Sequence, residues 1–190
     1  MATSIQQVYD TYDTLRETTT HYADLCPGIS KPLVNMLVDR LPQSSALTLS
    51  IGCGSGLLEA ILLHAADVDH GKQLNLFGVE VPDCAITHLT PDRVLRVPNT
   101  MSLHDDAILA STLMFVYPRQ AKLIRMYIDA AVDGALEQLI WLGHRSDWAE
   151  AELLLLAAFS KIQCIDGPGI AAYELLAIAS VPRRGSKQCD

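Results

Sequence analysis

From residue 46 onward, short apolar segments alternate with segments of helical periodicity, and this alternation limits the fold more than any other feature. Strands are expected near 46–51, 74–80, 93–97, 107–113, 136–142, 160–165 and 172–181, and helices near 56–66, 83–88, 118–132 and 147–158. Strands that alternate with helices are typical of βαβ units, in which helices cover both faces of a parallel sheet. The link "GPGIA" between the last two strands is too short for a crossover helix. We therefore expect an α/β fold with a doubly wound, mostly parallel seven-stranded sheet that ends in an antiparallel hairpin.

The first 45 residues differ in pattern from the rest. Apolar side chains from Ile5 to Leu15 recur at helical spacing, and Ser30 is placed to N-cap a second helix with a proline in its first turn. The 190 residues, 49% of them hydrophobic, suit a single core. We expect N-terminal helices over 1–45 that serve as a substrate lid, one domain over 46–182, and a flexible tail over 183–190.

Charge and cysteine usage exclude several classes of protein. A net charge of −8 repels polyphosphates, so no nucleic-acid partner is expected. The five cysteines form no C-x-x-C pair and have no histidine at ligand spacing, which predicts neither a metal site nor a disulfide framework. The first ten residues are polar, and the longest aliphatic run, 153–159, is too short to span a bilayer. We expect a cytoplasmic protein with no membrane segment.

The stretch "SIGCGSG", residues 50–56, lies between the first expected strand and its helix. A glycine-rich turn at this point lets the backbone approach a ligand, with the helix N-terminus aimed at it. Dinucleotide-binding folds use G-x-G-x-x-G, whose last glycine allows the helix to pack closely. Here Leu57 stands in that place, and the glycines instead run G-x-G-x-G.

That spacing resembles motif I of the class I S-adenosylmethionine-dependent methyltransferases. The resemblance extends over roughly residues 30 to 182, with a strand "LFGVEV" that ends in acidic Glu80 and a terminal pair of strands. It implies S-adenosyl-L-methionine as cofactor, with Glu80 on the ribose hydroxyls. The residues alone agree, because a carboxylate at the end of the second strand can accept two hydrogen bonds from a diol. The resemblance further implies that the methionine part meets Gly52, Cys53, Gly54, Ser55 and Gly56, and the adenine Asn99, Thr100 and Met101.

Ser50 departs from this pattern, because motif I usually has Asp or Glu at its position. Serine supplies a hydrogen bond but no charge. Two interpretations follow. Either another acid or a backbone carbonyl meets the ammonium of the cofactor, or the site is weakened in a protein that has drifted away from methyl transfer.

Catalytic groups are expected outside the carboxyl ends of the strands, where ligands of open α/β sheets bind. The fourth strand is followed by "STLMFVYP", which offers Ser111 and Thr112 to the cofactor and Tyr117 as a catalytic group. This segment lacks the Asn/Asp-Pro-Pro-aromatic sequence of enzymes that methylate planar nitrogens, and the paired acids of magnesium-dependent catechol enzymes. After the fifth strand, His144 is a candidate base. Alternatively, His144 only caps the strand end.

The function predicted from these features is S-adenosylmethionine-dependent methylation of a small molecule, more at oxygen than at an amide nitrogen. One alternative is a non-catalytic or regulatory interaction module, and another is an enzyme that binds the cofactor for a non-methylating reaction. Because the chain has few insertions, the site should be closed by the helix of Tyr9 and Tyr12, by a homodimer partner or another subunit, or by the carrier of the substrate.

Overall fold

The computed structural model describes residues 4–181, so the tail expected at 183–190 lies outside the described residues. Its helices are α1 (Ser4–Asp13), α2 (Lys31–Arg40), α3 (Leu57–Val68), α4 (Ala121–Ala131) and α5 (Trp148–Ala158). Short 3₁₀ helices span Pro91–Arg93, Asp105–Leu109 and Arg145–Asp147. The strands are β1 (Leu47–Ile51), β2 (Asn75–Glu80), β3 (Val94–Arg96), β4 (Ala110–Val116), β5 (Gln138–His144), β6 (Lys161–Ile165) and β7 (Glu174–Ser180).

All seven strands form one sheet in the order β3-β2-β1-β4-β5-β7-β6. The strands β3, β2, β1, β4 and β5 pair in parallel, whereas β7 is antiparallel to both β5 and β6. The expected doubly wound sheet with a C-terminal antiparallel hairpin is confirmed. Because β7 runs backwards, its first residues lie at the same edge of the sheet as the carboxyl ends of the parallel strands.

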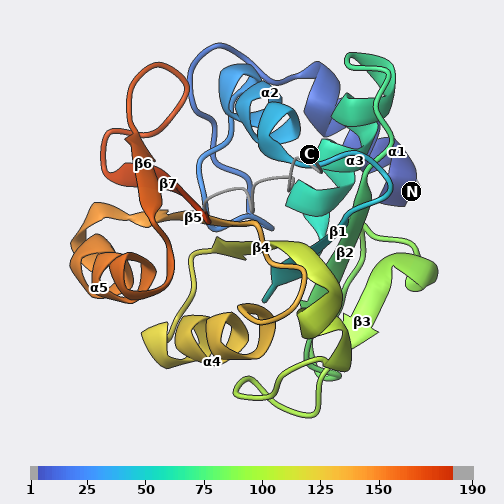
Figure 1. Ribbon diagram of the computed structural model, residues 1–190. Coiled ribbons are helices and arrows are strands. Elements are labelled where there is room, and N and C mark those ends of the chain that lie inside the picture. The colour runs from blue at the N-terminus through green and yellow to red at the C-terminus, as the bar shows by residue number, and fades with distance from the viewer. Residues whose placement is uncertain (1–3, 182–190) are drawn as a thin grey trace, which may run out of the picture.

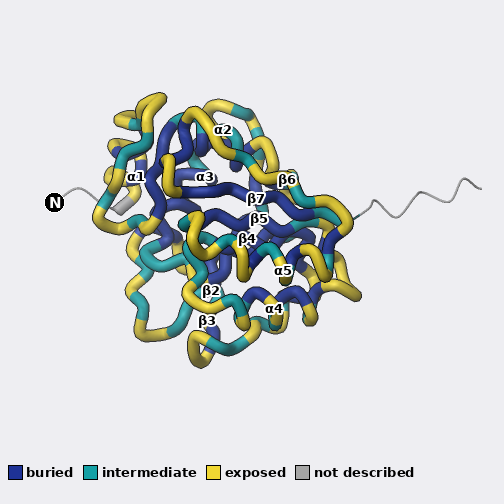
Figure 2. Tube along the Cα trace, turned by 90° about the vertical axis from the view of Figure 1, so that its left-hand side faces the viewer, coloured by how far each residue is buried: buried dark blue, intermediate teal, exposed yellow. Residues whose placement is uncertain are grey.

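Helices cover both faces of the sheet (Figure 1). The N-terminal helices α1 and α2 join α3 on one face, and α4 and α5 lie on the other. Alternation along each strand supplies both cores: in β1, Leu49 and Ile51 face α4 and α5, whereas Ser50 faces α3. The central strands are accordingly buried along most of their length (Figure 2).

The N-terminal segment is less helical than its periodicity predicts. Helix α1 ends at Asp13, and residues 14–30 are irregular apart from an isolated bridge between Thr20 and Ile29. The Tyr12 hydroxyl donates to Asp69 at 2.5 Å, and Lys31 also binds this carboxylate at 2.6 Å. This cluster fastens α1 to α2 and to the end of α3, so α1 packs on the outer side of α3.

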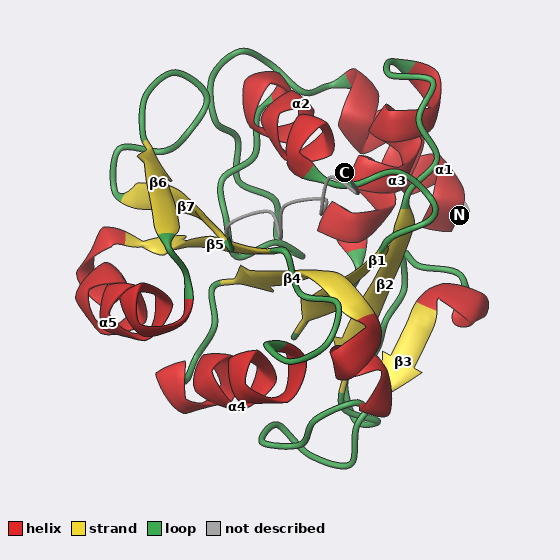
Figure 3. Ribbon diagram, in the orientation of Figure 1, coloured by secondary structure: helices red, strands yellow, loops and turns green. Residues whose placement is uncertain are grey.

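Two predicted elements are corrected. Residues 83–88, predicted as a helix, form a loop between Pro82 and Pro91 (Figure 3), and their N–H groups at 87 and 88 donate instead to the Ser55 carbonyl at 3.0 and 3.1 Å. The fourth strand, predicted at 107–113, is β4 at Ala110–Val116, because residues 105–109 form a 3₁₀ helix before it.

Among residues 4–181 no helix is both long enough and apolar enough to cross a membrane.

Gly56 should be the least replaceable residue of the glycine turn. It N-caps α3 at φ 78°, and an added Cβ would lie 2.8 Å from Leu89 Cγ. Gly56→Ala therefore combines a left-handed backbone with overpacking, and should lower the free energy of unfolding by about 3 kcal/mol in denaturant titration.

Gly71→Ala is the matched control, because Gly71 also has a positive φ (53°) but no atom within 4 Å of an added Cβ. Gly71→Ala should lower the free energy of unfolding only by the cost of a left-handed backbone, about 1 kcal/mol. Equal losses for the two variants would show that contact with Leu89 does not matter.

Candidate functional site

A cavity of about 440 Å³ opens at the carboxyl edge of the parallel strands. Five of the predicted site residues line it: Gly52, Gly54, Glu80, Thr100 and Tyr117. They come from the turn after β1, the end of β2, the loop after β3 and the end of β4. The parallel sheet thus brings together residues that are far apart in sequence, at the place where ligands of open α/β sheets bind. The rest of the lining is Cys26, Ile51, Val79, Val81, Cys84, Val97, Ser102, Val116, Pro118, Arg119, Gln120, Leu123 and Tyr127.

Gly52 and Gly54 border this cavity in left-handed conformations, with φ values of 76° and 57°. A Cβ built on either residue would meet no protein atom within 4 Å. These two glycines are therefore required by backbone conformation, and the space beside them is open to a ligand.

Glu80 holds the turn against the end of β2. Its Oε2 accepts the Gly54 N–H at 2.9 Å, and its Oε1 accepts the Val81 N–H at 2.9 Å. Each carboxylate oxygen keeps a second lone pair, and the side chain lines the cavity. This arrangement can accept hydrogen bonds from a pair of neighbouring hydroxyl groups.

Ser50 does not stand alone, because a buried carboxylate lies beside it. The Ser50 hydroxyl donates to Glu59 Oε1 at 2.6 Å, and Glu59 comes from the first turn of α3. Only 1% of Glu59 is exposed, and its Oε2 has no hydrogen-bond partner among the described residues. Burial raises the pKa of Glu59 to about 7; the Ser50 hydrogen bond opposes this shift and the nearby charge of Glu80 adds to it. Neither Ser50 nor Glu59 lines the cavity.

Three other residues of the predicted turn support it from outside the cavity. The Cys53 side chain lies over Gly78 of β2, and burial, followed by the charges of Glu59 and Glu80, raises the pKa of its thiol. The Ser55 hydroxyl donates to the Asp24 carbonyl at 3.1 Å, which ties the turn to the N-terminal segment. Gly56 packs against the 83–90 loop. The structure therefore gives Cys53, Ser55 and Gly56 structural contacts rather than a place in the lining.

The loop after β3 enters the cavity with Thr100 and Ser102. Asn99 and Met101, predicted as adenine contacts, lie outside the lining. The Asn99 side chain is used within the loop itself, where Oδ1 accepts the Met101 N–H at 2.9 Å.

Ser111 and Thr112 were predicted to face the cofactor, and the structure contradicts this. With β4 at Ala110–Val116, both residues are near its beginning, at the opposite edge of the sheet from the cavity. The Ser111 hydroxyl donates to the Leu47 carbonyl at 3.0 Å, and the Thr112 hydroxyl accepts from Gln138 at 3.0 Å. The prediction failed because the strand begins three residues later than its apolar pattern suggests.

Tyr117 follows β4 directly and is the only non-glycine residue with a positive φ, 50°, between residues 4 and 181. Its N–H donates to the Leu142 carbonyl at 2.7 Å, and its hydroxyl donates to Glu174 Oε1 at 2.7 Å. The same oxygen accepts the Gly28 N–H at 2.9 Å. Burial and the adjacent Glu174 raise the pKa of Tyr117. The phenol therefore stays protonated, and its oxygen keeps lone pairs that can accept a hydrogen bond.

His144, the other predicted catalytic residue, ends β5 at the same edge of the sheet but does not line the cavity. Its Nδ1 lies 2.7 Å from the Ser146 hydroxyl and accepts the Ser146 N–H at 3.2 Å, so the side chain caps the following turn. Its ring stacks on Tyr173 at 5.6 Å, and Tyr173 stacks on His21 at 6.1 Å. This row of rings joins the N-terminal segment to the end of β5, and the Tyr173 hydroxyl lies 2.6 Å from His21 Nε2.

Sequence reasoning missed the two buried acids, Glu59 and Glu174. Each carries a detectable signal, because each is a charged residue inside an otherwise apolar segment, "LLEAILL" and "AYELLAIA". It also missed Cys26, which brings the N-terminal segment to the cavity. Helix α1, expected as the lid, lies elsewhere.

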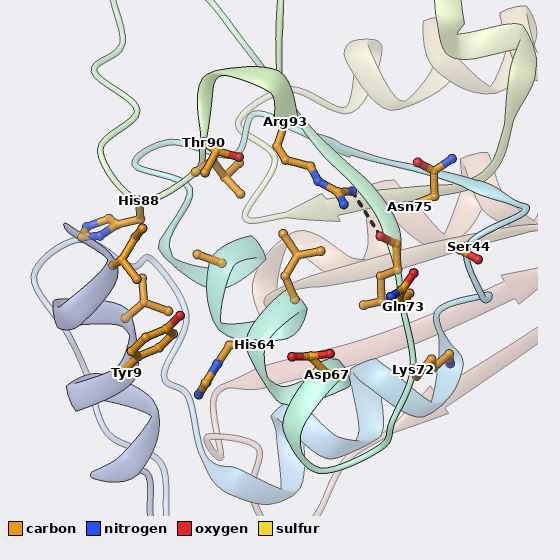
Figure 4. Close-up of a pocket in the computed structure, with 16 residues that line it drawn as sticks. Tyr9, Ser44, His64, Asp67, Lys72, Gln73, Asn75, His88, Thr90 and Arg93 are labelled. Atoms are coloured by element: carbon orange, nitrogen blue, oxygen red, sulfur yellow. Dashed lines mark hydrogen bonds between the residues drawn. The ribbon is translucent and has the colours of Figure 1, made fainter. Parts of the chain in front are cut away.

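A second cavity, of about 540 Å³, lies between α1, α3 and the 88–93 loop (Figure 4). Tyr9 and His64 face each other there with ring centroids 4.4 Å apart, and Arg93 donates to the Leu74 carbonyl at 3.1 Å. None of the predicted cofactor or catalytic residues borders this cavity. This second cavity is larger, but the candidate site is the cavity at the carboxyl edge, because the predicted residues line that one.

Among residues 4–181, no group of three or more His, Cys, Asp or Glu side chains is arranged to hold a metal ion.

Glu59 should make the stability of the protein depend on pH. Because its pKa rises on folding from 4.5 to about 7, the native state binds a proton more tightly than the unfolded state. The contribution of Glu59 to the free energy of unfolding should therefore fall between these two pH values, by about 3 kcal/mol. Denaturant titrations from pH 4.5 to 8 should show that Glu59→Gln removes this decline; an unchanged slope would contradict it.

The fold matches solved structures, whereas neither the family models nor the curated proteins give a match. A SAM-dependent O-methyltransferase from Thermotoga maritima is 16% identical, with a TM-score of 0.63 over 97% of this chain and 73% of that one. Precorrin-6y C5,15-methyltransferase from Geobacter metallireducens is 14% identical, with a TM-score of 0.54 over 87% and 95%. The human methyltransferase 10 domain containing protein is 16% identical, with a TM-score of 0.56 over 93% and 96%. The chain therefore has the Rossmann-like fold of these methyltransferases, as its sequence predicted.

Proposed function

We propose that the protein is an S-adenosyl-L-methionine-dependent methyltransferase that acts on a small molecule. The observation that carries the proposal is the cavity at the carboxyl edge, where Gly52 and Gly54 leave open space beside a turn that Glu80 holds in place. The fold likeness supports it, because the solved structures described above are methyltransferases by name. Their names also show that the fold serves different substrates, so the acceptor has to be argued from this chain.

The residues present fit the cofactor. Glu80 would accept hydrogen bonds from the ribose hydroxyls, and the backbone at Gly52 and Gly54 would approach the methionine part without side-chain hindrance. Thr100 and Ser102 would border the adenine. When bound, the cofactor supplies a methyl group activated by the positive charge of its sulfonium.

On the acceptor side, the chain has to orient a nucleophile and accept its proton. Tyr117 is the group placed to do this, because it lines the cavity and its own proton is directed to Glu174. A hydroxyl group on the acceptor can donate to the Tyr117 oxygen. The proton can then pass to Tyr117 as the tyrosine proton passes to Glu174. This favours a hydroxyl-bearing acceptor and methylation at oxygen.

The volume of the cavity and the net charge of the protein support a small acceptor. A cavity of about 440 Å³ is in the range of small-molecule sites, and it would have to hold both the cofactor and the reacting part of the acceptor. The net charge of −8 disfavours a polyanionic substrate. A cytoplasmic location and a partner subunit stay predictions.

The alternative of a non-catalytic interaction module was supported by the missing acid at Ser50 and by the thin cover over the substrate side. The carboxyl group of Glu59 lies 2.6 Å from the Ser50 hydroxyl, so an acid is present at this point of the fold. The alternative therefore loses one of its two supports, and ligand binding and turnover distinguish the two functions.

Ligand binding tests the cofactor site directly. S-adenosylhomocysteine at about 100 times its dissociation constant should stabilise the protein by about 2.7 kcal/mol, measured as a rise in melting temperature. Glu80→Ala should abolish the shift because it removes the acceptor for the ribose hydroxyls. Asp83→Asn, which removes an exposed carboxylate three residues away, is the control and should leave the shift unchanged. Absence of any shift for the unmodified protein at millimolar ligand would overturn the proposed function.

Turnover tests the acceptor side. With S-adenosylmethionine and a panel of small phenols and alcohols, Tyr117→Phe should lower methyl transfer about 100-fold, because it removes the group that accepts the proton. It should leave the affinity for S-adenosylhomocysteine within about twofold, because Glu80 and the glycine turn are intact. His144→Ala should have a small effect, because His144 lies outside the cavity. A large loss of methyl transfer in His144→Ala with a small loss in Tyr117→Phe would show that His144 is the base.

A further inference from the structure

Two carboxylates flank the glycine turn, and neither is paired with a cation. Glu80 accepts backbone N–H groups, and Glu59 accepts the Ser50 hydroxyl. None of the ion pairs between residues 4 and 181 involves either residue. A buried carboxylate without a positive partner is costly, and this cost raises the pKa of Glu59 to about 7. Above that pH the turn carries negative charge that no cation among the described residues pairs with.

Glu59 is the less satisfied of the two acids. It is 1% exposed, and its Oε2 has no partner among the described residues. Its position in the first turn of α3 stabilises negative charge only in part. The neighbouring Cys53 thiol lies within the turn, and Glu59 is the charge that acts on it most strongly. When Glu59 is ionised, its charge therefore acts on the turn from the side of α3.

We propose that Glu59 provides the negative charge that holds the ammonium group of the cofactor, in place of an acid at Ser50. This inference rests on the proposed function. Because Glu59 lies outside the cavity lining, it acts as a positioning residue through the Ser50 hydroxyl and the turn, without touching the ligand. Charge in a buried position is poorly screened by solvent, so its field reaches a bound ammonium beside the turn. The acid that the strand lacks is supplied by the helix.

Binding of two ligands distinguishes this role of Glu59 from a purely structural one. S-adenosylhomocysteine carries the amino-acid end, whereas 5′-methylthioadenosine has the same nucleoside and thioether without it. Glu59→Gln keeps the size and the hydrogen-bond acceptor of the side chain but removes its charge. At pH 8, calorimetry should show the dissociation constant for S-adenosylhomocysteine rising about tenfold, and that for 5′-methylthioadenosine changing less than about twofold.

Asp67→Asn is the matched control, because Asp67 is an exposed acid on the same helix and its loss changes the net charge equally. It should leave both dissociation constants unchanged. Glu59→Met, which is also neutral, provides a second variant if Glu59→Gln does not fold, and should show the same selective loss.

The outcomes are distinct. A selective loss of S-adenosylhomocysteine affinity in the Glu59 variants supports the inference. Equal changes for the two ligands, or none, overturn it and leave the proposed function standing, because the unmodified protein still binds its cofactor product. Failure of the unmodified protein to bind either ligand overturns the proposed function and this inference with it.

Discussion

The central strands β2, β1 and β4 run parallel to both of their neighbours, so both faces of the sheet have to be covered. The crossover segments do not supply this cover evenly, because residues 81–93 contain no α-helix. The N-terminal helices α1 and α2 complete the layer that α3 begins. With both faces covered by helices, the carboxyl edge is where the loops can form a cavity. The same constraint therefore accounts for the two cores and for the place of the candidate site.

Much of this arrangement could be predicted from the sequence, because it depends on local pattern. The alternation of strands and helices, the G-x-G-x-G turn and the acid at the end of β2 are each contained in a short segment, and Gly52, Gly54 and Glu80 lie at the cavity as expected. The position of β4 was wrong by three residues, and this placed Ser111 and Thr112 at the wrong edge. Apolar residues continue through the 3₁₀ helix before the strand, so hydrophobicity alone does not mark where β4 begins.

The contacts that could not be predicted join segments distant in sequence. Glu174 binds the Gly28 N–H and the Tyr117 hydroxyl, and Glu59 reaches back to Ser50 across the turn. Periodicity indicates that an acid in an apolar segment will be buried, but it does not indicate which donor will meet it. One of these acids accepts the hydrogen bond of the Tyr117 hydroxyl, and the other places a buried carboxyl group behind the turn.

The bond between Glu174 and Gly28 has a consequence for how the protein folds. The two residues are 146 positions apart, and Tyr117 lies between them in the chain. Bringing such distant segments together is slow because chain entropy opposes it, and the left-handed backbone of Tyr117 is held by partners on β5 and β7. The acceptor side of the site therefore depends on contacts of high sequence separation, the kind that slows folding. The contact between Gly54 and Glu80 at the glycine turn spans only 26 positions, so the two sides of the cavity differ in how far along the chain their contacts reach.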